Sequence, residues 1–182
     1  MPRITPLTAK SQLAPEHHAV ADAVVKVFGQ IGGPFSMLLH SPKLAERVLP
    51  LVSFFREITI VEPKLRSVAI LTAARERESE YVWAAQVVQA RRNGVPEQVI
   101  DLIRSKGDPA KFSADEREIV TYTRQLIRTN RVDQASFDAL KNVHGAQWMV
   151  ELTAAMHFYV FVSGIANAFE VPAPAGGDKL SS

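Results

Sequence analysis

The sequence predicts an all-α fold of about seven or eight helices. Apolar residues recur at intervals of three and four along most of the chain, and no stretch alternates with a period of two for long. The nine glycines fall mainly where these periodic segments end. Hydrophobic residues make up 47% and charged residues 22% of the 182-residue chain, which are ordinary proportions for a globular protein. We therefore expect one domain with a sizeable core.

This domain is expected to cover residues 15–172, between an N-terminal arm at 1–14 and a flexible tail at 173–182. The arm carries two prolines and shows no periodicity, and such arms often wrap a neighbouring subunit. The chain ends in PAPAGGDKLSS, whose proline, glycine and serine content is typical of a mobile segment.

Two helices and a loop are expected before residue 60. The first helix begins at Pro15, ends near Gly29 and places apolar side chains at Val20, Val24, Val27 and Phe28. Residues 31–42, IGGPFSMLLHSP, hold paired glycines and two prolines, so they predict a loop with a buried centre that walls a pocket. Ser41 and Pro42 then open a helix that Pro50 is expected to kink.

Three consecutive antiparallel helices are predicted between Pro63 and Gly107. The first, KLRSVAILTAARER, follows Pro63, and the second spans about Glu80 to Arg92 before a stop at Asn93-Gly94. The third, PEQVIDLIRSKG, ends at Gly107.

The remaining sequence predicts three further helices. A capping box, Ser113-x-x-Glu116, begins the helix SADEREIVTYTRQLIRT. The segment VDQASFDALKNVHG forms a short helix that stops at Gly145. The last helix, AQWMVELTAAMHFYVFVSGIANAFEV, is apolar nearly all round, so it must be buried or lie in a subunit interface.

Composition excludes several classes of function. The 21 basic and 19 acidic residues are interspersed, so the sequence lacks the basic patch that a nucleic-acid partner requires. The chain has no cysteine, which excludes disulfides, thiolate metal sites and thiol nucleophiles. No secretory signal is visible and no run approaches the roughly 20 apolar residues of a membrane span. We expect a soluble cytoplasmic protein without a membrane partner.

Metal and cofactor sites are not expected either. His17, His18, His40 and His144 show neither the His-x-x-x-His nor the Glu-x-x-His spacing that turns two ligands towards one metal. No serine lies in a Gly-x-Ser-x-Gly elbow.

The last predicted helix carries polar groups that need partners. His157 lies within it, where it is either a satisfied core histidine or a proton carrier. Tyr159, Ser163 and Asn167 follow at intervals of four, and they either pair with a neighbouring helix or subunit or face a ligand.

The segment ESEYVWAAQVVQ, residues 78–89, places Ser79, Val82, Trp83 and Gln86 on one side of a helix. Core packing explains the valine and the tryptophan. A serine and a glutamine in line with them indicate a lined cavity. Glu80 stands in the first helical turn, where the helix dipole favours a carboxylate for structural reasons alone.

The run from Ile70 to Ile103 resembles the carboxymuconolactone decarboxylase and alkylhydroperoxidase D (AhpD)-like superfamily. Members of this superfamily carry a helix reading roughly Glu-Tyr-x-Trp-x-x-His, followed by Ala-x-x-x-Gly and a short acidic helix. The resemblance extends over about residues 40–172. It implies an all-helical domain that forms dimers, trimers or hexamers, with a pocket between helices and often at a subunit junction.

The redox branch of this superfamily uses a Cys-x-x-Cys pair, a histidine and a glutamate. On this chain the two cysteine positions fall on Ser79 and Val82, the histidine on Gln86 and the glutamate on Ser67. All four residues are replaced. Thiol peroxidase activity is therefore excluded for this chain alone, because it has no thiolate to attack a peroxide.

The decarboxylase branch needs no cysteine, and its resemblance implies cofactor-free lyase chemistry on a small lactone carboxylate in aromatic catabolism. There too a histidine usually occupies the position of Gln86, which can orient a substrate but cannot exchange a proton near neutral pH. The proton carrier implied is then Glu80, His157 or Tyr81.

The resemblance also implies a set of ligand-binding residues. An arginine, Arg66 or Arg75, would hold the carboxylate through two hydrogen bonds. The other expected binding residues are Trp83, Gln86, Ser79 and Ser67. The alternative is a non-catalytic member, whose pocket only binds a small molecule or packs an oligomer.

Overall fold

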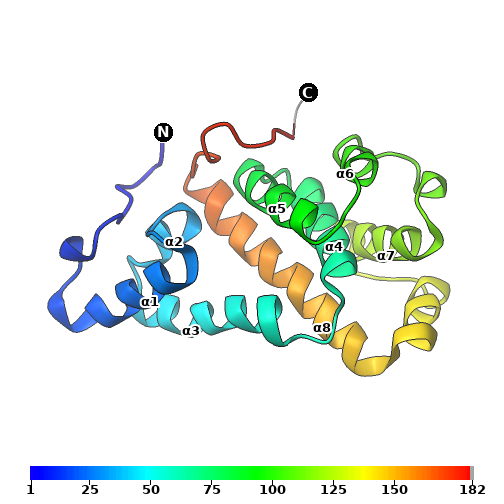
Figure 1. Cartoon of the computed structure of the whole chain (residues 1–182), viewed down its shortest axis with the longest axis horizontal. Helices are drawn as coiled ribbons and strands as arrows, with labels where there is room; N and C mark the ends of the chain where they lie inside the picture. The colour runs from blue at the N-terminus through cyan, green and yellow to red at the C-terminus, as the bar shows by residue number, and fades with distance from the viewer. Residues whose placement is uncertain (181–182) are drawn as a thin grey trace. The chain divides into compact units, whose positions relative to one another are not determined.

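The structure is a computed structural model that describes residues 1–180, and in that range it contains eight α-helices and no strand (Figure 1). The predicted all-α class is confirmed. The described chain divides into two compact units. Unit 1 comprises residues 1–59 and 164–172, and unit 2 comprises residues 60–163 together with the segment that begins at Ala173.

Unit 1 contains α1 (His18–Phe28), α2 (Gly33–Leu38) and α3 (Pro42–Ser53), followed by a π-helical turn at Phe54–Ile58. Pro42 occupies the start of α3 as predicted, and the helix continues through Pro50 into the π-helical turn.

The prediction of a loop at residues 31–42 is wrong, because α2 forms within it. Pro34 stands in the first turn, where its fixed φ suits a helix. Five of the six residues of α2 are buried, so packing stabilises a helix that the local glycine and proline content disfavours.

The N-terminal arm lies on its own unit. The Leu7 N–H donates to the Ser36 carbonyl oxygen at 3.0 Å, and Arg3 pairs with Glu170 at 2.9 Å. These contacts join the arm to α2 and to the chain that follows α8. That the arm also reaches a neighbouring subunit stays a prediction.

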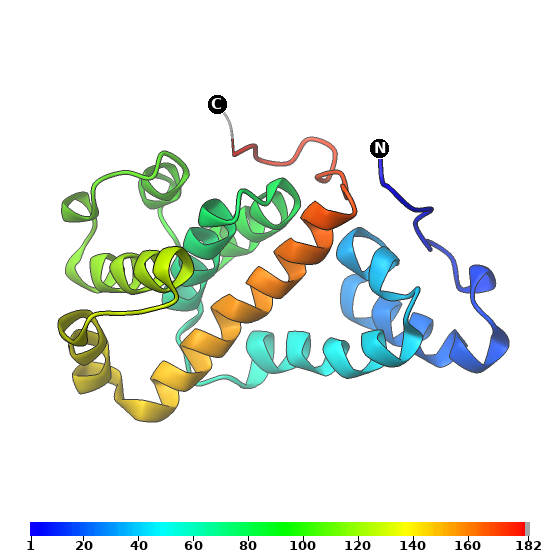
Figure 2. The same ribbon diagram turned by 180° about the vertical axis from the view of Figure 1, so that it is seen from behind.

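Unit 2 is built around α4, which packs against α5, α6 and α7 (Figure 2). The bounds of the four helices are Pro63–Glu76, Glu80–Arg92, Glu97–Arg104 and Ala114–Thr129. The predicted bounds of α5 are those observed. The side chains at the centre of this core are fully buried: Trp83, Ile100, Ile119, Leu152 and Met156.

The last helix, α8 (Gln134–Ala168), is interrupted at Gly145, whose φ of 84° and ψ of 173° are not helical. The predicted stop at this glycine is confirmed. Its left-handed φ is costly for residues with a Cβ. By length and composition alone α8 could cross a membrane, but Leu152 and Met156 lie in the core of unit 2, as in a core helix of a soluble protein.

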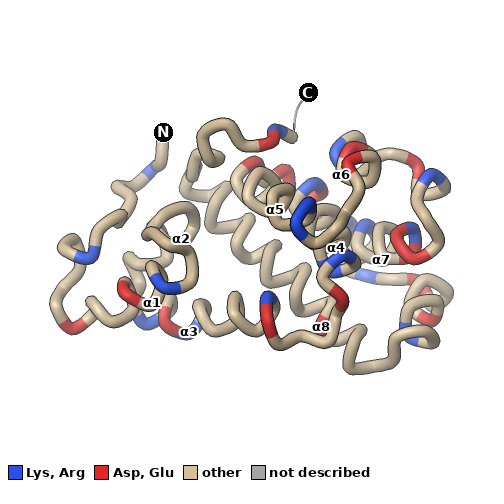
Figure 3. Tube along the Cα trace, viewed as in Figure 1, with Lys and Arg blue, Asp and Glu red and all other residues tan. Residues whose placement is uncertain are grey.

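Charges of both signs are interspersed along the chain (Figure 3).

One of the ion pairs fixes the start of α7. The Glu116 carboxylate accepts the Ser113 N–H at 3.3 Å, as the predicted capping box requires, and pairs with Lys64 at 2.8 Å.

Candidate functional site

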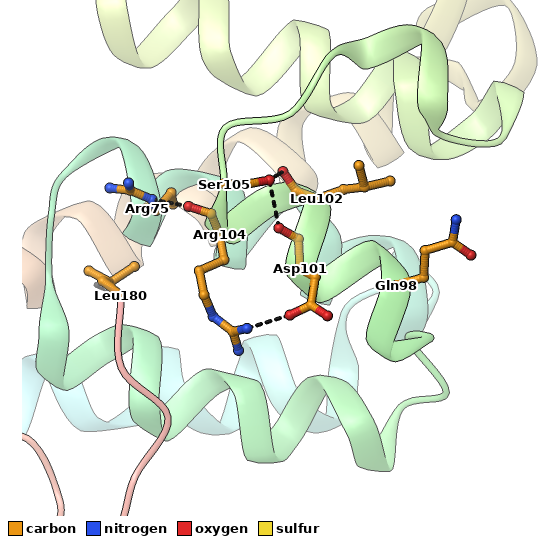
Figure 4. A pocket seen from close by; sticks show the side chains of 7 residues that line it. All are labelled: Arg75, Gln98, Asp101, Leu102, Arg104, Ser105 and Leu180. Atoms are coloured by element: carbon orange, nitrogen blue, oxygen red, sulfur yellow. Dashed lines mark hydrogen bonds and ion pairs between the residues drawn. The ribbon is translucent and has the colours of Figure 1, made fainter. Parts of the chain in front are cut away.

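A cavity of about 840 Å³ opens in unit 2 between the end of α4, helix α6 and the C-terminal segment (Figure 4). Its wall contains two guanidinium groups and one carboxylate. The lining residues are Arg75, Gln98, Asp101, Leu102, Arg104, Ser105 and Leu180.

The two arginines are held by the protein around them. The Arg75 Nε–H donates to the Arg104 carbonyl oxygen at 2.5 Å, and its guanidinium pairs with Glu78. The Arg104 guanidinium pairs with Asp101 and lies over the Trp83 ring, 5.5 Å from the ring centroid. Its Nε–H is buried without a hydrogen-bond partner in the described chain. An unpaired N–H of this kind can donate a hydrogen bond to an anionic ligand.

The C-terminal segment contacts the same region. Leu180 is 5% exposed, and its backbone N–H donates to the Glu80 carboxylate at 3.2 Å. The Asp178 carboxylate accepts two hydrogen bonds from Arg91, at 2.6 and 3.0 Å. These bonds from Arg91 hold the pKa of Asp178 below its usual value.

The stripe on α5 contains unsatisfied polar atoms. Ser79 and Trp83 are fully buried, and neither Ser79 Oγ nor Trp83 Nε1 has a hydrogen-bond partner among residues 1–180. Ser79 occupies the N-cap position of α5, but its hydroxyl does not cap the helix. Gln86 is half-buried on the same helix. Ser79 and Trp83 therefore retain free hydrogen-bonding capacity.

Tyr81 is suited to one role only. Burial raises the pKa of its phenol. The group is thus neutral near pH 7 and can donate a hydrogen bond, but it is a poor base there.

Ser67 and Arg66 bind other parts of unit 2. Ser67 Oγ accepts a hydrogen bond from Asn93 Nδ2 at 2.9 Å, which ties α4 to the end of α5. Arg66 donates to the Val61 carbonyl oxygen at 2.7 Å, and burial lowers the pKa of its guanidinium. Neither residue lines the 840 Å³ cavity.

His157 belongs to a separate set of contacts. Its Nδ1 lies 3.0 Å from the Thr153 carbonyl oxygen, which only accepts, so Nδ1 carries the hydrogen. The Thr153 hydroxyl in turn contacts the Tyr122 hydroxyl at 2.7 Å. His157 does not line the cavity.

The structure thus brings Arg75, Glu80 and Trp83 to one region, through their shared contacts with Arg104 and Leu180. Of these three, Arg75 lines the cavity itself, whereas Glu80 and Trp83 contact residues of its wall; the other predicted residues do not line it. Sequence reasoning missed three polar residues of the region: Arg91, Arg104 and Asp178. Both arginines stand in the last turn of a helix, where a basic residue is expected on structural grounds alone.

Other sites on the described chain fit the predicted residues less well. A cavity of about 560 Å³ lies in unit 1 between α1 and α3, and a cavity of about 510 Å³ lies beside α7 in unit 2. None of the predicted site residues lines either one. Residues 1–180 contain no group of three or more histidine, aspartate or glutamate side chains placed to hold a metal ion.

No protein-family model matches the chain, and no curated protein matches it by sequence. Solved structures do match. One is a variant of the debrominase Bmp8 in which a cysteine is replaced by alanine, in complex with 2,3,4-tribromopyrrole. Its TM-score against this chain is 0.73, and the sequence identity is 16%. The match covers 96% of this chain and 95% of that one.

Two further structures agree on the fold. The AhpD core of an uncharacterized peroxidase-related protein from Ralstonia eutropha JMP134 has a TM-score of 0.73 and 14% identity, over 94% of each chain. A protein of unknown function from Agrobacterium tumefaciens, linked by name to the antioxidant defence protein AhpD, has a TM-score of 0.66 and 18% identity. That match covers 76% of this chain and 95% of the other. The predicted AhpD-like fold is confirmed.

Proposed function

We propose that this chain binds a small carboxylated or lactone-containing metabolite in the cavity beside α6 and performs lyase-type chemistry on it without a cofactor. The observation that carries the proposal is the pair of guanidinium groups, Arg75 and Arg104, in one cavity wall. Guanidinium groups recognise carboxylates through directed, charge-assisted hydrogen bonds.

The AhpD-like fold supports a small cyclic ligand. The similar debrominase variant binds a halogenated pyrrole although one of its cysteines is replaced by alanine. A cysteine at that position is therefore not required for this fold to hold a small ring. By analogy, the cysteine-free chain described here retains the means to bind one.

Glu80 is the proton carrier in this proposal. Decarboxylation breaks the bond between a ring carbon and the carboxylate carbon, releases that carbon as CO2, and leaves on the ring carbon an electron pair that takes up a proton from Glu80. Of the predicted proton carriers we choose Glu80 because its carboxylate accepts the N–H of Leu180, a residue of the cavity wall. Tyr81, with its raised pKa, would contribute a hydrogen bond rather than a base.

The direct test is the ultraviolet turnover of carboxymuconolactone and related lactones by wild type, Glu80→Gln and Gln86→His. The proposal expects turnover by wild type that Glu80→Gln abolishes and Gln86→His preserves or raises, since the imidazole restores a second proton carrier. Absence of turnover by both wild type and Gln86→His would reject the lyase activity.

A second candidate function is binding without catalysis. Two observations favour it: Gln86 cannot exchange a proton, and the Glu80 carboxylate is already engaged by a backbone N–H. A thermal-shift screen separates the two functions, because a binder gains about 2.7 kcal/mol of stability at a hundredfold excess of ligand over Kd without converting it.

Self-association is a further part of the proposal. Val143 and Val150 lie on either side of the Gly145 interruption of α8, with 75% and 68% of their surfaces exposed, and such apolar side chains can be covered in an oligomer. We expect light scattering to detect a dimer or larger oligomer, and Val150→Asp to shift it towards the monomer. A monomeric wild type would contradict this part.

A further inference from the structure

The C-terminal segment at residues 174–180 follows one face of α5 (Figure 1). Leu180 bonds to Glu80, Gly177 packs against Ala84, and Asp178 pairs with Arg91. The three positions on α5 are separated by four and seven residues, a spacing that keeps them on one side of a helix.

Gly177 allows this close approach. A Cβ built on Gly177 would lie 2.9 Å from the Ala84 Cβ and 3.0 Å from the Pro174 carbonyl oxygen. Neither neighbour is the end of a flexible side chain, so a larger residue at this position would move the segment away from α5.

The Asp178 carboxylate is bound as a ligand carboxylate would be. Arg91 donates to both of its oxygens, at 2.6 and 3.0 Å, and Arg104 lies 3.3 Å from one of them. On its other edge the Arg91 guanidinium also donates to Glu97, at 2.7 and 2.9 Å. Two parallel N–H···O bonds from one guanidinium are the geometry by which arginine recognises carboxylates. Arg104 also lines the cavity, so the two sites share a residue.

We propose that Arg91 and Arg104 form a carboxylate-binding subsite that Asp178 of the chain itself occupies, and that a carboxylated ligand displaces the 174–180 segment from it. The inference rests on the proposed function, because it assumes a carboxylated ligand. It adds Arg91 to the binding residues. It also assigns the segment the role of an internal competitor.

The segment is held weakly enough to be displaced. The side chains of Arg91 and Asp178 are 41% and 23% exposed, and ion pairs that solvent reaches contribute little stability. Within residues 173–180, Leu180 alone is buried. The anchors are thus one apolar side chain, the contact of Gly177 with Ala84, a backbone hydrogen bond and a partly exposed carboxylate.

Because the chain has no cysteine, a single introduced thiol can be labelled without labelling any other residue of the same type. A nitroxide on Lys179→Cys, an exposed position, reports the mobility of the segment by electron paramagnetic resonance. Benzoate serves as the carboxylate probe and benzamide as its uncharged counterpart. Calorimetry on the unlabelled full chain measures the affinity for benzoate of wild type and of Asp178→Asn. Asp115→Asn is the control, because it changes an exposed carboxylate elsewhere. Asp178→Glu is the conservative variant.

We expect benzoate to mobilise the label while benzamide does not. Asp178→Asn should bind benzoate about three- to fivefold more tightly than wild type, because the internal competitor is weakened. Asp115→Asn and Asp178→Glu should bind it like wild type. Circular dichroism confirms that each variant is folded.

The possible failures are distinguishable. If benzoate binds wild type and Asp178→Asn equally and leaves the label immobile, the internal competitor is rejected while the proposed function stands. If benzamide mobilises the label as benzoate does, the carboxylate assignment is rejected. If benzoate binds neither protein, the proposed function fails and the inference fails with it.

Discussion

At residue scale, two serines in unit 2 have opposite surroundings. Ser79 Oγ is buried without a hydrogen-bond partner in the described chain, whereas Ser67 Oγ accepts a bond from Asn93 at 2.9 Å. An unsatisfied buried polar atom costs about 1–3 kcal/mol, while a satisfied one contributes about 1 kcal/mol. The same substitution at the two positions should therefore act in opposite directions.

We expect Ser79→Ala to leave the free energy of unfolding unchanged or to raise it by about 1 kcal/mol, and Ser67→Ala to lower it by about 1 kcal/mol. Urea denaturation of both variants beside wild type measures the difference. A loss in Ser79→Ala as large as that in Ser67→Ala would mean that the Ser79 hydroxyl has a partner after all.

Glu116 carries a pH-dependent contribution to stability. Burial raises the pKa of its carboxyl, but the Lys64 ion pair and the bonds from Ser113 outweigh burial and leave the pKa below its usual value. A depressed folded-state pKa gives stability that is complete above the unfolded value and is lost as the pH falls through the folded value.

We therefore expect Glu116→Gln to be less stable than wild type at pH 7, and the difference to diminish as the pH falls below about 4.3, the ordinary value for a glutamate. Thermal unfolding across this pH range provides the measurement, with Glu118→Gln as a control, since the Glu118 side chain is 33% exposed in its pair with Arg117 whereas that of Glu116 is 5% exposed. A difference that stayed constant with pH would contradict the role assigned to the Glu116 charge.

At the scale of elements, the local signals located most helices. Periodicity and stop residues indicated the bounds of α5, and Gly145 interrupts α8 where it was expected to. Helix α2 was missed because burial, a long-range effect, overrides its glycines and prolines.

The same contrast between local signals and long-range contacts holds for the residues of the candidate site. Arg75, Glu80 and Trp83 could be selected from the sequence, because they stand in or beside a recognisable helix. The contacts of Asp178 with Arg91 and Arg104 join residues 74 or more positions apart in sequence, and no periodic signal reports such a pairing. A glycine- and proline-rich end therefore predicts a flexible tail when the sequence is taken alone, and the last two residues of this tail lie outside the described chain.

Two glycine substitutions contrast an open position on α8 with the close packing of the C-terminal segment. A Cβ placed on Gly164, within α8, would meet no atom within 4 Å, so Gly164→Ala should raise stability by about 0.5–1 kcal/mol through helix propensity. Gly177→Ala should instead loosen the segment, because its Cβ would meet Ala84 at 2.9 Å. Hydrogen exchange at the Leu180 amide reads out the second effect. Unchanged protection of that amide in Gly177→Ala would contradict the close packing.

At the scale of the whole molecule, an AhpD-like fold is combined with a sequence that has no thiol and no histidine on α5. The chain keeps a cavity with two arginines, a carboxylate beside it and unsatisfied donors on the buried stripe. These features favour recognition of a small carboxylate over redox chemistry, and in the proposed function Glu80 is the residue on which turnover would depend.

The most direct test of this account is the affinity for carboxymuconolactone, measured from ligand-dependent thermal shifts of wild type, Arg104→Gln and the control Arg131→Gln. We expect Arg104→Gln to bind about tenfold more weakly, as loss of a charged hydrogen bond implies, and Arg131→Gln to bind like wild type. Equal affinities in all three proteins would contradict the assignment of the ligand to the cavity beside α6.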